Sequence, residues 1–132
     1  MYLHIDRHTA RPEQYAQFIE KASGFGIRVE ALAGDPSWGR TENRHYIRTF
    51  MEWVVSYNTN VERSQQFSGI HLDIEPYLLP EWDTEQELVV KQWLSNLEYT
   101  MHMAGWLGGI EVILDVPFWI DRIKVPGYEQ MD

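Results

Sequence analysis

The stretch Phe67–Tyr77 has the sequence FSGIHLDIEPY, and it decides both the fold and the candidate site. Side chains alternate between the two faces of a strand, so the isoleucines and the leucine share one face and the ionisable residues share the other. The ionisable face carries His71, Asp73, Glu75 and Tyr77. Buried charges are costly unless they have partners or a purpose. We therefore predict a buried strand that delivers two carboxylates to its C-terminal end, with Cα atoms roughly 6.5–7 Å apart.

Composition and charge limit the classes of protein to consider. Of the 132 residues, 44% are hydrophobic and 14% aromatic, so we expect one domain, residues 1–132, with a sizeable core. The net charge of -9 argues against nucleic acid and anionic membranes as partners, because both reward Lys and Arg. No apolar run approaches the roughly 20 residues of a membrane span. The lack of cysteine excludes thiolate metal sites and leaves the compartment open.

Three helical patterns separate four strand-like segments. The expected strands are Tyr2–Asp6, Ile27–Ala33, Phe67–Tyr77 and Ile110–Val116. The helices are expected to begin at Thr9–Pro12, at a Thr41 cap and at a capping box in Thr84–Glu87. Their core-facing positions are expected to include Tyr46, Ile47, Phe50, Val54 and Tyr57, then Leu88, Trp93, Leu97, Met101 and Ala104.

Alternation of strand and helix predicts an α/β fold with a parallel sheet. Four β/α units make half of an eight-stranded barrel, so we expect a partial or half barrel of the TIM type. An open four-stranded sheet would leave two long edges exposed. Self-association or a further barrel segment is therefore expected to cover those edges.

Polar and aromatic residues follow each expected strand, on the side where parallel α/β folds bind ligands. Trp38, Trp82 and Trp119 all lie in loops after strands. His4 and His71 are expected to be hydrogen-bonded interior histidines. Beside the carboxylate pair, the candidate substrate-binding residues are His71, Tyr77, Trp38, Trp119, Asp115, Asp35 and Asp6.

The carboxylate strand resembles the fourth strand of the family 18 glycoside hydrolases, the chitinase-like TIM barrels. That family carries an Asp-Gly-x-Asp-x-Asp-x-Glu signature, and Gly69, Asp73 and Glu75 match it in register. Ser68 and His71 stand where the signature has its first two aspartates. The resemblance covers about a dozen residues strongly.

The resemblance implies a glycoside hydrolase acting on a polysaccharide or an amino-sugar glycan, without a cofactor. Glu75 would be the general acid that protonates the leaving glycosidic oxygen. Asp73 would assist by orienting the substrate's acetamido group, which acts as nucleophile in the family. Two carboxylates this close cannot both ionise freely, so the pKa of one is expected to rise.

Two other functions fit the same residues. The first is a non-catalytic degenerate barrel that binds a glycan or a protein partner. The second is a metal-dependent hydrolase with a Zn, Mg or Mn ion at the barrel mouth. Its ligands would come from His4, Asp6, His71, Asp73, Glu75 and Asp115, although the chain has no His-x-His pair.

Overall fold

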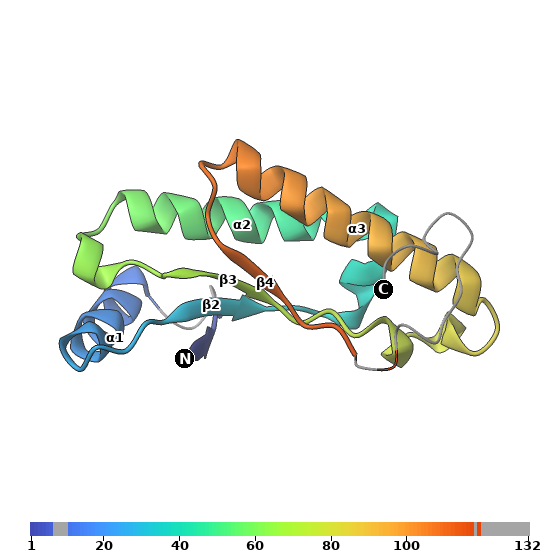
Figure 1. Cartoon of the computed structure of the whole chain (residues 1–132), viewed down its shortest axis with the longest axis horizontal. Helices are drawn as coiled ribbons and strands as arrows, with labels where there is room; N and C mark the ends of the chain where they lie inside the picture. The colour runs from blue at the N-terminus through green and yellow to red at the C-terminus, as the bar shows by residue number, and fades with distance from the viewer. Residues whose placement is uncertain (7–10, 118, 120–132) are drawn as a thin grey trace.

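The order of elements is β-α-β-α-β-α-β, as expected (Figure 1). The computed structural model describes residues 1–6, 11–117 and 119, so Thr9, part of the first expected helix start, lies outside the described residues. The elements are β1 (Tyr2–His4), α1 (Pro12–Gly24), β2 (Glu30–Ala33), α2 (Arg44–Thr59), β3 (Gly69–Leu72), α3 (Gln86–Trp106) and β4 (Val112–Leu114). Short 3-10 turns fill the connections after β2 and β3.

The four strands form one parallel sheet in the sequential order β1-β2-β3-β4. The register aligns Leu32 of β2 with His71 of β3, and His71 with Ile113 of β4. Each strand is shorter than its sequence pattern suggested. β3 ends at Leu72 because the chain soon bends into the 3-10 turn Pro76–Leu78, which a proline at its start favours.

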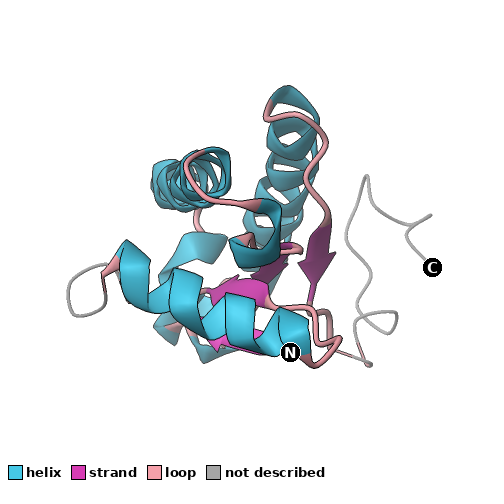
Figure 2. Cartoon of the chain, turned by 90° about the vertical axis from the view of Figure 1, so that its left-hand side faces the viewer, coloured by secondary structure: helices cyan, strands magenta, loops and turns pink. Residues whose placement is uncertain are grey.

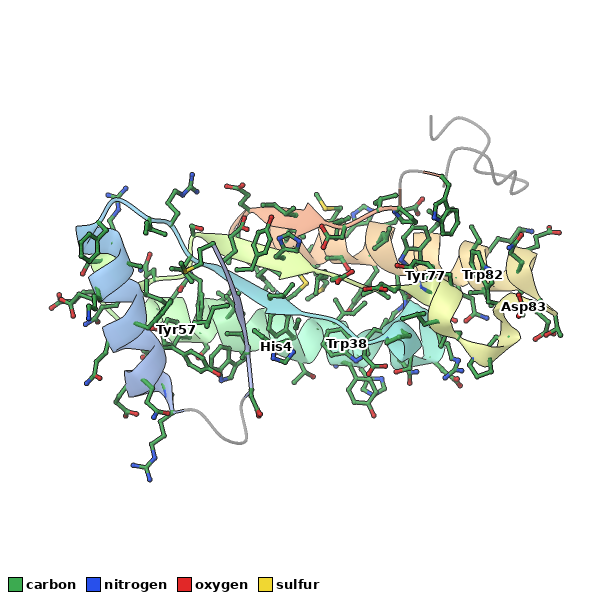
Figure 3. All side chains as sticks on the ribbon, turned by 90° about the horizontal axis from the view of Figure 1, so that it is seen from below. His4, Trp38, Tyr57, Tyr77, Trp82 and Asp83 are labelled. Carbon is green, nitrogen blue, oxygen red and sulfur yellow. The ribbon has the colours of Figure 1, made fainter. Side chains whose placement is uncertain are left out.

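The hydrophobic core lies between one face of the sheet and the three helices. Ile70, Leu72 and Ile74 are buried there, as the alternation in β3 predicted. Helices α1, α2 and α3 contribute residues to the same cluster, and the end-on view shows α2 and α3 on one side of the sheet (Figure 2). Seen from the other side, the strands lie in front of α2 and α3 (Figure 3). The alternate residues of the strands occupy this second face, which we call the open face.

Two of the predicted helix starts were wrong. Thr41 belongs to a 3-10 turn, Thr41–Asn43, and α2 begins after it without a side-chain cap. Glu85 is the N-cap of α3 and makes no capping hydrogen bond, while the Thr84 hydroxyl donates to the Glu81 carbonyl. Both segments have capping-type residues, but the helices begin later than expected, with Asn43 and Glu85 at the N-cap positions.

The predicted core faces of α2 and α3 were correct except at three positions. Tyr46, Leu88 and Met101 are about half exposed. In α3 the adjacent Val89 and Val90 are buried instead, because three consecutive apolar residues leave the helix phase ambiguous in the sequence.

Asn96 of α3 fixes the loop that follows β2. Its buried side-chain amide donates to the carbonyls of Trp38 and Arg40 at 2.7 and 2.8 Å. Its oxygen accepts from Arg44 Nε at 3.2 Å. A fully satisfied buried amide is a rigid anchor. The loop that borders the C-terminal ends of the strands is therefore held by the helical layer.

Candidate functional site

Two carboxylates stand together where β3 ends. The Asp73 N–H donates to the Ala33 carbonyl at 3.0 Å. This bond extends the β2–β3 ladder by one residue and fixes Asp73 at the C-terminal end of β3. Glu75 follows, and Pro76 then turns the chain away. Asp73 and Glu75 line one pocket of about 140 Å³ on the open face. The other lining residues are His4, Leu32, Ala33, Gly34, Pro36 and Leu78.

The pKa of Asp73 is raised, as expected for one member of a close carboxylate pair. Burial is the largest cause, followed by the charge of Glu75 and a hydrogen bond between the two carboxyl groups. The charge of Asp115 adds to the rise, and the charge of His71 opposes it. Asp73 therefore keeps its proton to a higher pH than an isolated aspartate does.

Tyr77 holds Glu75 from the other side. Its hydroxyl donates to Glu75 Oε2 at 2.7 Å. This hydrogen bond, together with burial and the nearby carboxylates, raises the pKa of Tyr77 to about 12. The phenol therefore stays protonated and remains a donor at neutral pH. Glu75 thus shares its pocket with Asp73 and accepts a hydrogen bond from a donor that stays protonated.

Three aromatic rings form a cluster beside Glu75. Tyr77, Trp82 and Trp119 are mutually tilted or edge-to-face, with ring centroids 5.6 to 6.4 Å apart. All three are half-buried, and they come from the segments after β3 and after β4. Tyr77 and Trp82 lie toward the end of the molecule away from α1 (Figure 3). The structure therefore joins Trp119, and Trp82 with it, to the carboxylate pair.

The remaining predicted residues lie in different surroundings. Trp38 stacks on Tyr46 of α2 with the ring planes 7° apart, and packs against the core. Asp35 accepts from the N–H and the hydroxyl of Ser37 at 2.9 and 2.7 Å, so it caps a turn. Asp6 exchanges backbone hydrogen bonds with the Tyr15 hydroxyl.

The two histidines of the open face differ. His71 is buried and contacts Asp115 of the segment after β4 and Glu30 of β2. His4 is exposed, so the prediction of an interior histidine was wrong there. His4 lies on β1, which is an edge strand of the sheet in the described part of the chain. An edge strand has a neighbour on one side only, which leaves its side chains less covered.

Sequence reasoning missed Glu30, which faces the Nδ1 atom of His71. The only signal was the alternation Glu30-Ala-Leu-Ala, which assigns Glu30 to the polar face of β2. The partner of Glu30 follows from the register between β2 and β3, which aligns Glu30 with Gly69 and Leu32 with His71. That register is a property of the folded sheet.

Gly34 provides a test of how tightly Asp73 is held. A Cβ atom added to Gly34 would lie 1.9 Å from the Asp73 carbonyl oxygen, so the backbone must shift to admit it. We expect Gly34→Ala to destabilise the protein by roughly 1–3 kcal/mol and to shift the amide signals of Asp73 and Glu75. Urea unfolding and amide NMR measure the two effects.

Gly24→Ala is the matched control for this substitution. A Cβ there meets no atom within 4 Å, and Gly24 is the last residue of α1. We expect a change in the free energy of unfolding within about 0.5–1 kcal/mol, and no shift of the Asp73 signal. Equal effects of the two substitutions would mean that Gly34 does not position Asp73.

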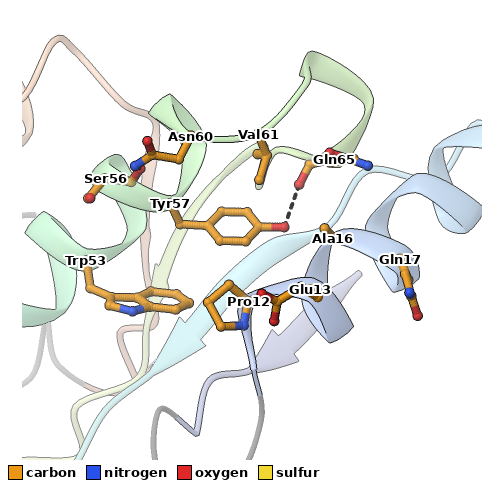
Figure 4. A pocket seen from close by; sticks show the side chains of 10 residues that line it. All are labelled: Pro12, Glu13, Ala16, Gln17, Trp53, Ser56, Tyr57, Asn60, Val61 and Gln65. Atoms are coloured by element: carbon orange, nitrogen blue, oxygen red, sulfur yellow. Dashed lines mark hydrogen bonds between the residues drawn. The ribbon is translucent and has the colours of Figure 1, made fainter.

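A larger pocket, of about 530 Å³, lies between α1 and α2 (Figure 4). Trp53 and Tyr57 form much of its wall, and the Tyr57 hydroxyl donates to the Gln65 carbonyl at 2.8 Å. Burial raises the pKa of Tyr57 to about 12. Glu13 and Tyr57 are its ionisable lining residues, and nothing there pairs a nucleophile or an acid with a base. We therefore locate the candidate chemistry at the smaller pocket, which contains the carboxylate pair.

The described residues contain no group of three or more His, Asp or Glu side chains arranged to hold a metal ion. Within the same residues, no helix combines the length and the apolar character needed to cross a membrane.

The chain was also compared with known proteins. No protein-family model, no curated protein and no solved structure matches it. The likeness to family 18 glycoside hydrolases therefore rests on Gly69, Asp73 and Glu75 of the sequence, and it stays a prediction.

Proposed function

We propose that this chain is a glycoside hydrolase-like half barrel that acts on a polysaccharide or an amino-sugar glycan. One observation carries the proposal. Asp73 and Glu75 line one pocket at the C-terminal end of a parallel strand, beside the aromatic cluster of Tyr77, Trp82 and Trp119, and the charge of Glu75 helps to raise the pKa of Asp73. A carboxyl pair with one raised pKa is suited to acid catalysis near neutral pH.

The strand order supports the barrel part of the proposal. Strands of a TIM barrel follow one another sequentially, whereas a doubly wound sheet reverses its order and carries helices on both faces. Here the order is sequential, and the helices join one core on one face. The pocket of about 140 Å³ is also small beside the roughly 300–1,000 Å³ of typical ligand sites. We propose that a second copy or a further barrel segment completes the mouth.

In the proposed reaction, Glu75 donates a proton to the glycosidic oxygen as the bond from that oxygen to the anomeric carbon breaks. Following the family 18 resemblance, the substrate's acetamido oxygen attacks the anomeric carbon, and Asp73 orients that group. Water then opens the intermediate and returns a proton to Glu75. The raised pKa of Asp73 and its hydrogen bond to Glu75 let the pair hold the proton before the reaction.

The aromatic cluster would bind the sugar ring next to the acid. We expect Trp119→Ala to raise the Kd for soluble N-acetylglucosamine oligosaccharides about tenfold, roughly 1.4 kcal/mol, because a large aromatic contact is lost. Trp106→Ala is the matched control, since Trp106 at the end of α3 is 86% exposed and remote from Glu75 in the fold. Titration calorimetry with these sugars, and with glucose oligosaccharides, measures both variants. Equal Kd values for the wild type and Trp119→Ala would contradict the assignment.

The alternative function is a non-catalytic module that binds a glycan. The small volume of the carboxylate pocket, about 140 Å³, favours it, because a small pocket offers few contacts to hold a sugar in position for bond cleavage. The same titrations test it when they are combined with a reducing-sugar assay. Binding without release of product supports the module, and binding with release supports the hydrolase.

A further inference from the structure

His71 is buried although it lies on the open face of the sheet. Its side chain is 2% exposed, whereas Asp73, two residues further on, is half-buried. The Tyr2 ring of β1 covers it, with ring centroids 4.1 Å apart. A buried imidazole needs partners for its ring nitrogens. Those partners come from the strands on either side.

Both ring nitrogens of His71 face carboxylates. Nδ1 lies 3.4 Å from Oε1 of Glu30 on β2, and Nε2 lies 2.8 Å from Oδ1 of Asp115, which follows β4. The Nε2 contact has the distance of an ion pair without the alignment of a hydrogen bond. An ionised carboxylate only accepts hydrogen bonds, so a ring that carries hydrogen on both nitrogens satisfies both neighbours.

We propose that Glu30 and Asp115 hold His71 as an imidazolium, and that His71 is a positioning residue whose charge keeps one member of the Asp73–Glu75 pair ionised. The network spans β2, β3 and the segment after β4. Among the described residues, the titratable groups that contact His71 or interact with its charge are Tyr2, Glu30, Asp73 and Asp115. The effect on catalysis rests on the proposed function, whereas the charge on His71 does not.

The charge of His71 affects the protonation of Asp73. Burial, Glu75 and Asp115 raise the pKa of Asp73, and the charge of His71 lowers it. Without that cation, the environment would favour protonation of Asp73 still more. A pair in which both carboxyls are protonated lacks the anion that orients the substrate. His71 therefore acts through Asp73, at a position that the ligand itself does not reach because the ring is buried.

Histidine-selective ¹⁵N NMR tests the charge directly. The chain has five histidines, and the His71 signals are assigned by their loss in His71→Gln. We expect both ring nitrogens of His71 to be protonated at neutral pH in the wild type, and to change to a neutral tautomer when Glu30→Gln and Asp115→Asn are combined. A neutral His71 ring in the wild-type protein would overturn the proposal.

The effect of the His71 charge on the pKa of Asp73 is tested by ¹³C NMR of the Asp73 carboxyl group. We expect the pKa of Asp73 to rise in His71→Gln and to stay unchanged in Glu111→Gln. Glu111 is the matched control because it precedes β4 but pairs with Arg28, and its side chain is 57% exposed. If His71→Gln does not fold, Asp115→Asn replaces it, since Asp115 is half exposed at the end of a strand.

Asp115→Asn removes a carboxylate that raises the pKa of Asp73 and also a partner of His71, so the ¹⁵N signals of His71 are its readout. A ring that stays fully protonated in both Asp115→Asn and Glu30→Gln would contradict the network. In a working enzyme, we expect kcat of His71→Gln to fall about tenfold or more at neutral pH, with a recovery at higher pH. An imidazolium in a protein that releases no sugar would support the network while contradicting the hydrolase.

Discussion

Glu75→Gln is expected to abolish glycan hydrolysis while leaving glycan binding in place. The amide has the shape of the carboxyl group but no proton to give, so general acid catalysis is lost. That loss corresponds to a fall in kcat of about 10²–10⁴-fold. The aromatic cluster is unchanged, so the Kd for N-acetylglucosamine oligosaccharides is expected to stay within about twofold. A reducing-sugar assay and calorimetry provide the two measurements.

Glu98→Gln is the control for this substitution, because Glu98 is exposed on α3. It makes the same carboxyl-to-amide replacement and is expected to change neither kcat nor Kd. The hydrogen bond from Tyr77 to Glu75 can be kept by the amide oxygen, so the fold around the site is expected to survive. Hydrolysis by Glu75→Gln at the wild-type rate would contradict the assignment of Glu75 as the acid.

Trp93→Ala is expected to produce the largest loss of stability. Trp93 is fully buried in α3 and lies against Gly39, in the 3-10 turn that follows β2. Replacing a buried tryptophan by alanine costs about 3–5 kcal/mol, because the transfer free energy and the contacts around the new cavity are both lost. Domains of this kind are stable by only about 5–15 kcal/mol. The variant is therefore expected to be largely unfolded at moderate urea concentrations.

Two further variants make this result specific. Trp93 Nε1 is buried and has no hydrogen-bond partner among the described residues, so Trp93→Phe is expected to cost clearly less than Trp93→Ala. Trp106→Ala, at an exposed site, is expected to change the free energy of unfolding by less than about 0.5 kcal/mol. A Trp93→Ala protein as stable as Trp106→Ala would mean that α3 does not anchor this turn.

The order of the elements and the two faces of β3 could be predicted because both depend on local periodicity. Ile70, Leu72 and Ile74 alternate with polar residues, and that pattern alone assigns them to the core. The helix starts were less predictable. Thr41 and Thr84 have side chains suited to capping, but Thr41 lies inside a 3-10 turn and Thr84 lies between the 3-10 turn Pro80–Trp82 and the N-cap Glu85.

The parts of the site that are close in sequence could be predicted, whereas the parts that depend on strand pairing could not. Asp73 and Glu75 are two residues apart, so a single strand end brings them together. Glu30 and Asp115 reach His71 from two other segments, and their positions follow from a register that no spacing in the sequence reveals. Trp38 and Trp119 looked equivalent as tryptophans after strands. In the structure, Trp38 stacks on Tyr46 of α2, whereas the Trp119 ring contacts the Tyr77 ring beside Glu75.

The raised pKa of Asp73 determines whether this residue stabilises or destabilises the folded protein as the pH changes. The folded protein binds this proton more tightly than the unfolded chain does, so the site lowers stability as pH rises from the ordinary range of aspartate through the raised pKa. Below the ordinary range, Asp73 is protonated in both states and the penalty is absent. Because burial is the largest cause of this rise, only the part that is lost in Glu75→Gln reports the interaction between the two carboxyls.

The central claim is that Asp73 and Glu75 act as one coupled pair, and ¹³C NMR titration of the Asp73 carboxyl tests it most directly. In the wild type we expect a pKa above the ordinary value of about 3.9 for aspartate, and in Glu75→Gln a fall toward that value, because the charge of Glu75 is gone. An Asp73 carboxyl that titrates in the ordinary range in the wild type, or whose pKa does not move in Glu75→Gln, would contradict the claim.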